Sequence, residues 1–272
     1  MRIRVDHNTS YRYELPASNV VQYLRLSPSD SEDQHVRNWR IDIDADGKLR
    51  ESRDSFGNRL HIFYADGAVT DLRIHVTGEV EVEDAGGLVR GAPDPLPTSV
   101  FLRSTALTTP DATIRDLADG ARRGDGVETL HALNLAIFGA LAFETGTTST
   151  TTAATEALRN GRGVCQDFAH IFCSAARLIG IPARYVSGHL ARSGSAAQQD
   201  ASHAWAEAFV PELGWLAFDA TNGICADGNY VRVAVGLDYL DAAPVRGARR
   251  GGGGEVMDVS VHAVETQAQR QQ

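Results

Sequence analysis

The chain has 272 residues, of which 43% are hydrophobic and 22% charged, and 35 acidic residues against 26 basic ones give a formal net charge of −9. This length suits one large or two ordinary domains, and the composition excludes disordered, collagen-like and disulfide-rich scaffold proteins. The acidic balance argues against nucleic acid or an anionic membrane surface as the main partner, because both attract clustered Lys and Arg. We expect a protein, a peptide or a small molecule as the partner instead.

Cysteine content and the N-terminal sequence bear on the cellular compartment. Three cysteines are too few, and odd in number, for a disulfide framework, which indicates a reducing compartment. The opening residues MRIRVDH lack the apolar run of a signal peptide, and no segment approaches the roughly 18 apolar residues of a membrane span. We therefore expect a soluble, cytoplasmic protein, and its oligomeric state stays open.

The first third of the chain has the alternation that is typical of β-strands. Apolar residues occupy every second position in segments 39–43, 60–64 and 72–82. Turn-forming sequences such as Ala-Asp-Gly and Phe-Gly-Asn separate these segments. Short strands at this spacing predict an antiparallel β-sandwich domain over residues 1–83.

A second domain is expected beyond a Gly- and Pro-rich linker at residues 84–110. Helices are predicted at 111–123, 128–141 and 153–159, and strands at 183–190, 202–210, 215–221, 230–235 and 256–264. We assign residues 111–264 to this domain, with a flexible linker at 249–254. The polar end, residues 265–272, is predicted to be a disordered tail.

The clearest helix of the chain begins at Cys165. Its apolar stripe consists of Val164, Phe168, Ile171, Phe172, Ala175, Leu178 and Ile179, and it ends at Gly180. The preceding glycine-flanked loop places Cys165 in the first helical turn, where about half a positive charge favours a thiolate. Taken alone, the pattern leaves open the alternative of an inert buried cysteine, which suits Cys173 and Cys225.

A thiolate nucleophile needs a base, and the base needs an orienting carboxylate. His203 and Asp219 lie on the two strands of a predicted hairpin. If Phe209 pairs with Trp215, His203 and Asp219 share one face and lie one diagonal step apart, with about 7–8 Å between their Cα atoms. The sequence therefore permits an imidazole–carboxylate hydrogen bond between them.

Four sequence blocks resemble, in the right order, the motifs of the transglutaminase-like superfamily of papain-type cysteine enzymes. They are GRGVCQDFAH at 161–170, GIPARYVSG at 180–188, SHAWAE at 202–207 and GWLAFDATN at 214–222. The β-rich first third also resembles the N-terminal domain of bacterial members. The resemblance implies an α+β fold in which a nucleophile helix packs on an antiparallel sheet, after an N-terminal β-sandwich.

The resemblance also implies a catalytic triad of Cys165 as nucleophile, His203 as base and acid, and Asp219 as orienting residue. The amide N–H of Cys165 is then one oxyanion donor, and Gln166 is an available side chain for the second. Two positions depart from the family pattern, since relatives usually have proline at Ala220 and arginine at Leu237. The first departure frees a backbone dihedral beside Asp219, and the second removes a charge that could meet an anionic substrate group.

Other candidate sites have weaker patterns. The segment DIDADG at 42–47 begins like a calcium loop, but its twelfth position is Arg53 where a bidentate Glu is required, so we expect a strand and turn. The cysteines lack the close spacing of zinc ligands. We predict no metal or cofactor. Structural or cleft-lining roles are expected for His170, His189, Trp205 and Trp215.

These patterns together predict a cysteine enzyme that forms an acyl-thioester on Cys165 from an amide or peptide bond. With water as the acceptor it is a protease or amidase, and with an amine it is a transglutaminase. We favour hydrolysis, since water is always present and no amine site is recognisable. The alternatives are a non-catalytic binding module on the same fold and a redox or metal-binding thiol protein.

Overall fold

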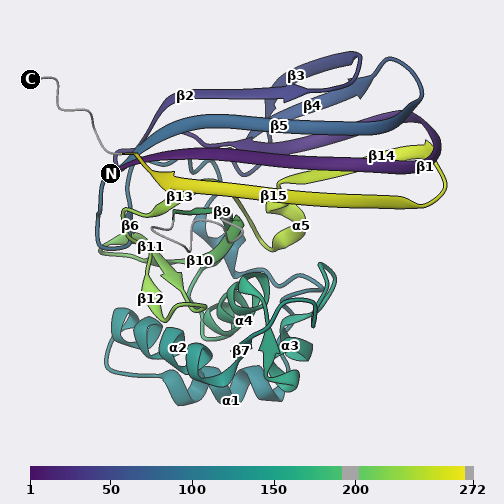
Figure 1. The fold of residues 1–272 in the computed structure, drawn as a ribbon. Coiled ribbons are helices and arrows are strands. Elements are labelled where there is room, and N and C mark those ends of the chain that lie inside the picture. The colour runs from purple at the N-terminus through teal and green to yellow at the C-terminus, as the bar shows by residue number, and fades with distance from the viewer. Residues whose placement is uncertain (192–201, 267–272) are drawn as a thin grey trace, which may run out of the picture.

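The structure is a computed structural model that describes residues 1–191 and 202–266. Figure 1 shows three layers: a large sheet of long strands, a second sheet in the middle, and a group of helices on the far side. The predicted α+β class is confirmed. Among the described residues, no helix combines the length and apolar character needed to cross a membrane.

The large sheet has seven antiparallel strands, in the order β2-β5-β1-β4-β3, with β14 and β15 both paired with β1. Its strands are β1 (Arg2–Ser27), β2 (Gln34–Ile43), β3 (Gly47–Arg53), β4 (Arg59–Ala65), β5 (Val69–Val82), β14 (Val245–Gly251) and β15 (Glu255–Glu265). The first half of β1 pairs with β5 and β15, and its second half pairs with β4 and β14. This sheet curls around an apolar core that includes Tyr11, Leu24 and Leu72.

The last two strands differ from the sequence prediction, which places residues 245–264 in the second domain. In the structure β14 pairs antiparallel with the second half of β1 and β15 with its first half, and Gly251, Gly252 and Gly253 lie at positive φ where the two strands connect. Residues 249–254, predicted as a flexible linker, are therefore strand and turn. Pairing satisfies the backbone N–H and C=O groups that the long β1 would otherwise leave exposed at its edge.

The predicted linker and the start of the predicted tail are also ordered parts of the fold. The segment predicted as a linker, 84–110, contains the short strand β6 (Leu88–Val89), which pairs with β11, and the 3₁₀ helix η1 (Thr98–Leu102). At the other end, the amide of Thr266 donates to the carbonyl of Arg2 at 2.8 Å. The rest of the predicted disordered tail, 267–272, lies outside the described residues.

The middle sheet has the strand order β12-β11-β10-β9-β13, and β6 joins it through β11. These strands are β9 (Ala183–Leu190), β10 (Ser202–Val210), β11 (Gly214–Asp219), β12 (Ile224–Cys225) and β13 (Tyr230–Gly236). Phe209 faces Trp215 across the β10–β11 hairpin, so the predicted register is confirmed. The side chains of Val231 and Val233 on β13 pack with Val5 and Val261 of the large sheet and join the two sheets.

The central helix α4 (Cys165–Leu178) packs against β9 and β10 and is surrounded by the other helices. These are α1 (Ala112–Ala121), α2 (Gly126–Ala140) and α3 (Ala154–Asn160); a short helix, α5 (Tyr239–Ala242), and two short strands, β7 (Ala142–Phe143) and β8 (Arg162–Gly163), complete the fold. The side chains of Asp111 and Asp125 cap α1 and α2 by accepting from backbone amides, as the sequence favours at these positions. The apolar stripe of α4 lies in the main core, which fixes the helix that starts at Cys165.

Candidate active site

Cys165 is the first residue of α4, and its side chain is partly exposed. The turn before it is held by Asp167, whose Oδ2 accepts from the amide of Val164 at 2.8 Å and from the hydroxyl of Thr148 at 2.7 Å. A side chain at Gly163 would collide with Asp167, because a Cβ there would lie 2.6 Å from Asp167 Oδ2. The thiol thus sits at the positive end of a rigidly anchored, buried helix.

His203 on β10 and Asp219 at the end of β11 are brought together by the hairpin register. His203 Nε2 lies 2.6 Å from Asp219 Oδ2, and both residues are buried. The ring of Trp205 lies roughly parallel to that of His203, with the ring centroids 6.2 Å apart. The imidazole is therefore fixed in position by one hydrogen bond and by an aromatic side chain of the same strand.

Nδ1 is the nitrogen of His203 that is not bonded to Asp219, and Cys165 lies close enough to His203 to influence its pKa. Burial alone would lower the pKa of His203, but the interactions with Asp219 and Cys165 outweigh it and raise that pKa to about 10. The imidazolium form therefore predominates at neutral pH. The structure thus brings all three predicted site residues, Cys165, His203 and Asp219, together, with His203 hydrogen-bonded to Asp219 and lining the same cavity as Cys165.

Asp219 receives more hydrogen bonds than the sequence predicts. In addition to His203, the hydroxyl of Tyr230 and the amide Nδ2 of Asn222 each donate to Oδ2 at 2.6 Å. The backbone amides of Thr221 and Asn222 donate to Oδ1 at 2.9 and 3.3 Å. Burial would raise the pKa of Asp219, but these donors, His203 first, outweigh it and keep that pKa below its usual value.

Tyr230 and Asn222 are site residues that the sequence reasoning does not identify. Asn222 is the last residue of the GWLAFDATN block, so its place near Asp219 was available from the motif. Tyr230 lies on β13, which pairs with β9 and not with the β10–β11 hairpin. Its approach to Asp219 depends on the order of strands in the sheet, and no local pattern reports that order.

A cavity of about 240 Å³ opens at Cys165 and His203. Gln166, the candidate second oxyanion donor, lines this cavity, and its Nε2 makes a long 3.4 Å contact with the carbonyl of Ser149. Across the cavity lie residues of the large sheet, including His7 and Thr9 of β1. The N-terminal region therefore forms part of the wall of the candidate site.

The other residues singled out from the sequence are absent from the lining of this cavity and make contacts of their own. His170 accepts from the amide of Tyr239 at 3.0 Å, and burial lowers its pKa to about 4. His189 is also buried, with its pKa lowered to about 3, and its ring meets that of His7 edge to face. Trp215 lies under the guanidinium of Arg184 at 3.8 Å. Over residues 1–191 and 202–266, His, Cys, Asp and Glu side chains form no group of three that could hold a metal ion.

The two departures from the family pattern, Ala220 and Leu237, both have defined surroundings in the structure. Ala220 is buried beside Asp219, whose position is fixed by the donors of Tyr230 and Asn222. The backbone carbonyl of Leu237 accepts from Nη2 of the buried Arg177 at 2.7 Å. Neither departure alters the hydrogen bond between His203 and Asp219.

Comparison with known proteins agrees with this architecture. Residues 115–220 match the transglutaminase-like superfamily, and residues 3–81 match the bacterial transglutaminase-like N-terminal region. The uncharacterized protein ML0607 of Mycobacterium leprae is 32% identical over 273 residues, which cover 96% of this chain and 97% of the relative. The uncharacterized protein Rv2569c of Mycobacterium tuberculosis is 32% identical over 290 residues, which cover 97% and 92% of the two chains.

A solved structure with the same fold comes from Cytophaga hutchinsonii and is described as "a Putative Cysteine Protease". Its TM-score is 0.76 at 20% sequence identity, with 98% of this chain and 92% of that chain covered. The likeness extends over both sheets and the helical layer, so the fold is shared as a whole. From its two matched regions and its full-length relatives, the chain belongs to the transglutaminase-like superfamily of cysteine enzymes.

Proposed function

We propose that the protein hydrolyses amide or peptide bonds through an acyl-thioester on Cys165. The observation that carries this proposal is the hydrogen-bonded pair of His203 and Asp219, with His203 beside Cys165 in the wall of one cavity. A nucleophile, an acid–base group and an orienting carboxylate in this order are the requirements of covalent acyl transfer. A non-catalytic binding module has no need of a buried carboxylate with this many donors.

In the proposed first half-reaction, the Cys165 sulfur attacks the amide carbon, and the carbonyl π electrons move to the oxygen. The amide N–H of Cys165 at the start of α4 faces the developing oxyanion, and Gln166 is the candidate second donor. The tetrahedral species collapses as the C–N bond breaks. His203 Nδ1–H gives its proton to the departing amine, which leaves the acyl group on sulfur.

In the second half-reaction, water attacks the thioester carbon and gives a proton to the now neutral His203. The C–S bond breaks, and a carboxylic acid leaves while the Cys165–His203 pair is restored. Asp219 holds the Nε2–H of His203 throughout, so that Nδ1 is the nitrogen that exchanges the proton. Water fits the acceptor role because the cavity is open to solvent beside the partly exposed Cys165.

A peptide library incubated with the protein, with and without a primary amine, tests this proposal by mass spectrometry. Hydrolysis adds one water across a cleaved bond or converts an amide to an acid, whereas transfer adds the amine with loss of ammonia. We expect hydrolysis in both mixtures, its loss in Cys165→Ala and its retention in the matched Cys225→Ala variant. Amine incorporation as the main product would replace hydrolysis with acyl transfer, and no product in either mixture would overturn the proposal.

A further inference from the structure

The cavity beside Cys165 has one wall that does not come from the catalytic sheet and helix. His7 and Thr9 of β1 and Met257 and Val259 of β15 form it, and Val245 of β14 completes it. Thr9 pairs with Val259 and Tyr11 with Met257 across the two strands, so these side chains share one face of the large sheet. The C-terminal strands β14 and β15 therefore contribute directly to the surroundings of the thiol.

This wall offers no charge to a ligand. Among the described residues that line the cavity there is no Asp, Glu, Lys or Arg. His7 is buried, its Nε2 lies 2.9 Å from the hydroxyl of Thr9, and burial lowers its pKa to about 4, so it is neutral at pH 7. A carboxylate or an ammonium group placed against this wall would lose hydration without gaining a partner from it, because the imidazolium of His203 belongs to the catalytic sheet on the other side of the cavity.

The size and exposure of the wall suit an apolar group. A dry cavity of about 150 Å³ lined by aliphatic and aromatic side chains is large enough to bind benzene, and this one measures about 240 Å³. The apolar side chains of Met257 and Val259 remain 56% and 37% exposed at its rim. Covering them would remove apolar surface from water and so favour binding.

We propose that this wall, defined by Thr9, Val245, Met257 and Val259, is a specificity subsite that receives an uncharged aliphatic or aromatic side chain next to the scissile amide. The inference rests on the proposed function, because it assigns the substrate class of the same site. It gives the N-terminal domain and the C-terminal strands β14 and β15 a role in substrate selection. Peptides with an acidic or basic residue at that position are excluded by the missing counter-charge.

Alternation along β15 provides matched variants. Met257 and Val259 line the cavity, whereas Val256 points to the opposite face of the sheet, where it lies in a separate hollow with Arg12 and Asp71. Val256 is 69% exposed, so Val256→Asp is a control that adds the same charge to the same strand outside the cavity. Met257→Asp and Val259→Asp place a carboxylate in the subsite at positions exposed enough to keep the fold, which thermal unfolding verifies.

The experiment measures alkylation of Cys165 by three iodoacetamides that carry an N-phenethyl, an N-carboxyethyl or an N-aminoethyl group. Each rate is divided by the rate of the same reagent with glutathione. We expect the phenethyl reagent to be favoured over both charged reagents by about tenfold or more in the wild type and in Val256→Asp. In Met257→Asp and Val259→Asp this preference shrinks to within about threefold, and the aminoethyl reagent gains over the carboxyethyl reagent.

Equal corrected rates for the three reagents in the wild type would overturn the subsite. An unchanged preference in both Asp variants of the cavity would overturn it as well. The proposed function is tested separately in the same samples, because His203→Ala must slow alkylation of Cys165 by every reagent. Alkylation that depends on His203 but shows no apolar preference therefore rejects the subsite alone.

Discussion

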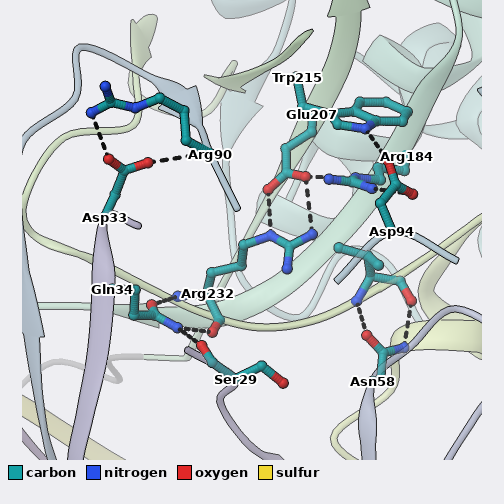
Figure 2. Close-up of polar contacts among 11 residues, drawn as sticks. Ser29, Asp33, Gln34, Asn58, Arg90, Asp94, Arg184, Glu207, Trp215 and Arg232 are labelled. Carbon is teal, nitrogen blue, oxygen red and sulfur yellow. Dashed lines mark hydrogen bonds and ion pairs between the residues drawn. The ribbon is translucent and has the colours of Figure 1, made fainter. Parts of the chain in front are cut away.

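The side-chain amide of Asn58 makes two hydrogen bonds with the backbone of Val235, as a neighbouring strand would. Its Nδ2 donates to the Val235 carbonyl at 2.7 Å, and its Oδ1 accepts from the Val235 amide at 2.8 Å. Figure 2 shows that Gln34 does the same for Arg232, with distances of 2.9 and 2.8 Å. Two side chains of the N-terminal domain thus cover the outer edge of β13, the strand that carries Tyr230.

Removal of the Asn58 hydrogen bonds to β13 is expected to weaken the contact between the two sheets. Asn58→Ala leaves the buried backbone N–H and C=O of Val235 without partners, and each such group costs about 1–3 kcal/mol. Urea unfolding measures the loss, with Asn38→Ala, an exposed asparagine of β2, as the control. A midpoint for Asn58→Ala that matches that of Asn38→Ala would contradict a structural role for this pairing.

Tyr230 is expected to act on the reaction only through Asp219. Burial and the nearby Asp219 raise the pKa of Tyr230, so its hydroxyl stays protonated and donates. Tyr230→Phe removes one hydrogen bond to a charged group, worth about 1.5–3 kcal/mol, and should raise the pKa of Asp219. The acid limb of the pH–rate profile then moves to higher pH. A lower rate with an unmoved acid limb would assign Tyr230 a packing role instead.

The rates of amide hydrolysis and of thiol alkylation should depend differently on pH above neutrality. Because the pKa of His203 is raised to about 10, hydrolysis should fall as pH rises through that value and the imidazole loses the proton it gives to the leaving amine. Alkylation of Cys165 needs no such proton and should not fall. Both rates are measured on the same samples between pH 7 and 11. Loss of hydrolysis already near pH 7 would contradict the raised pKa.

The same shift links His203 to stability. Its pKa in the folded protein, about 10, lies above the ordinary value of 6.5, so its contribution is complete below pH 6.5 and disappears as pH rises through about 10. The difference in free energy of unfolding between the wild type and His203→Gln should therefore shrink over that range. Urea titrations at pH 6, 8 and 10 measure this difference, and a constant value would contradict the linkage.

Glu207 lies between two arginines inside the protein, as Figure 2 shows. Its carboxylate meets Arg184 Nε at 2.6 Å and Arg232 Nε at 2.8 Å, and it is fully buried. Burial would raise the pKa of Glu207, but the two arginines, Arg232 first, outweigh it and lower that pKa to about 2. The stabilising contribution of this carboxylate is therefore present above pH 4.5 and is lost as pH falls through about 2.

Glu207→Gln is expected to destabilise the protein by about 3–5 kcal/mol at pH 7, because it removes the carboxylate partner of Arg232 and leaves the buried Arg184 with Asp94 alone. Glu81, which also contacts two arginines but has a side chain that is 28% exposed, supplies the control Glu81→Gln, with a much smaller effect. Thermal unfolding at pH 7 compares the two variants. Equal losses of stability would show that the buried ion pairs of Glu207 stabilise the protein no more than those of Glu81.

Local patterns predicted much of this fold and of its candidate site. The apolar stripe of α4 and the Phe209–Trp215 register are properties of neighbouring residues, and they sufficed to place Cys165 at a helix start and His203 on the same face as Asp219. The place of β14 and β15 in the N-terminal sheet was not predicted, because these strands pair with β1 across more than 220 residues of sequence. Gly251–Gly253 resembles a linker in sequence, but in the structure it connects two strands that both pair with β1.

The most direct test of the central claim is the mass of the Cys165 peptide after brief incubation with an activated ester, followed by acid quenching. The account predicts one acyl group on Cys165, released by hydroxylamine as a thioester is, and absent from the Cys165→Ala variant. In the His203→Ala variant, formation of this acyl group should slow by at least about tenfold. Acylation spread equally over Cys165 and Cys225, or unchanged by His203→Ala, would contradict the account.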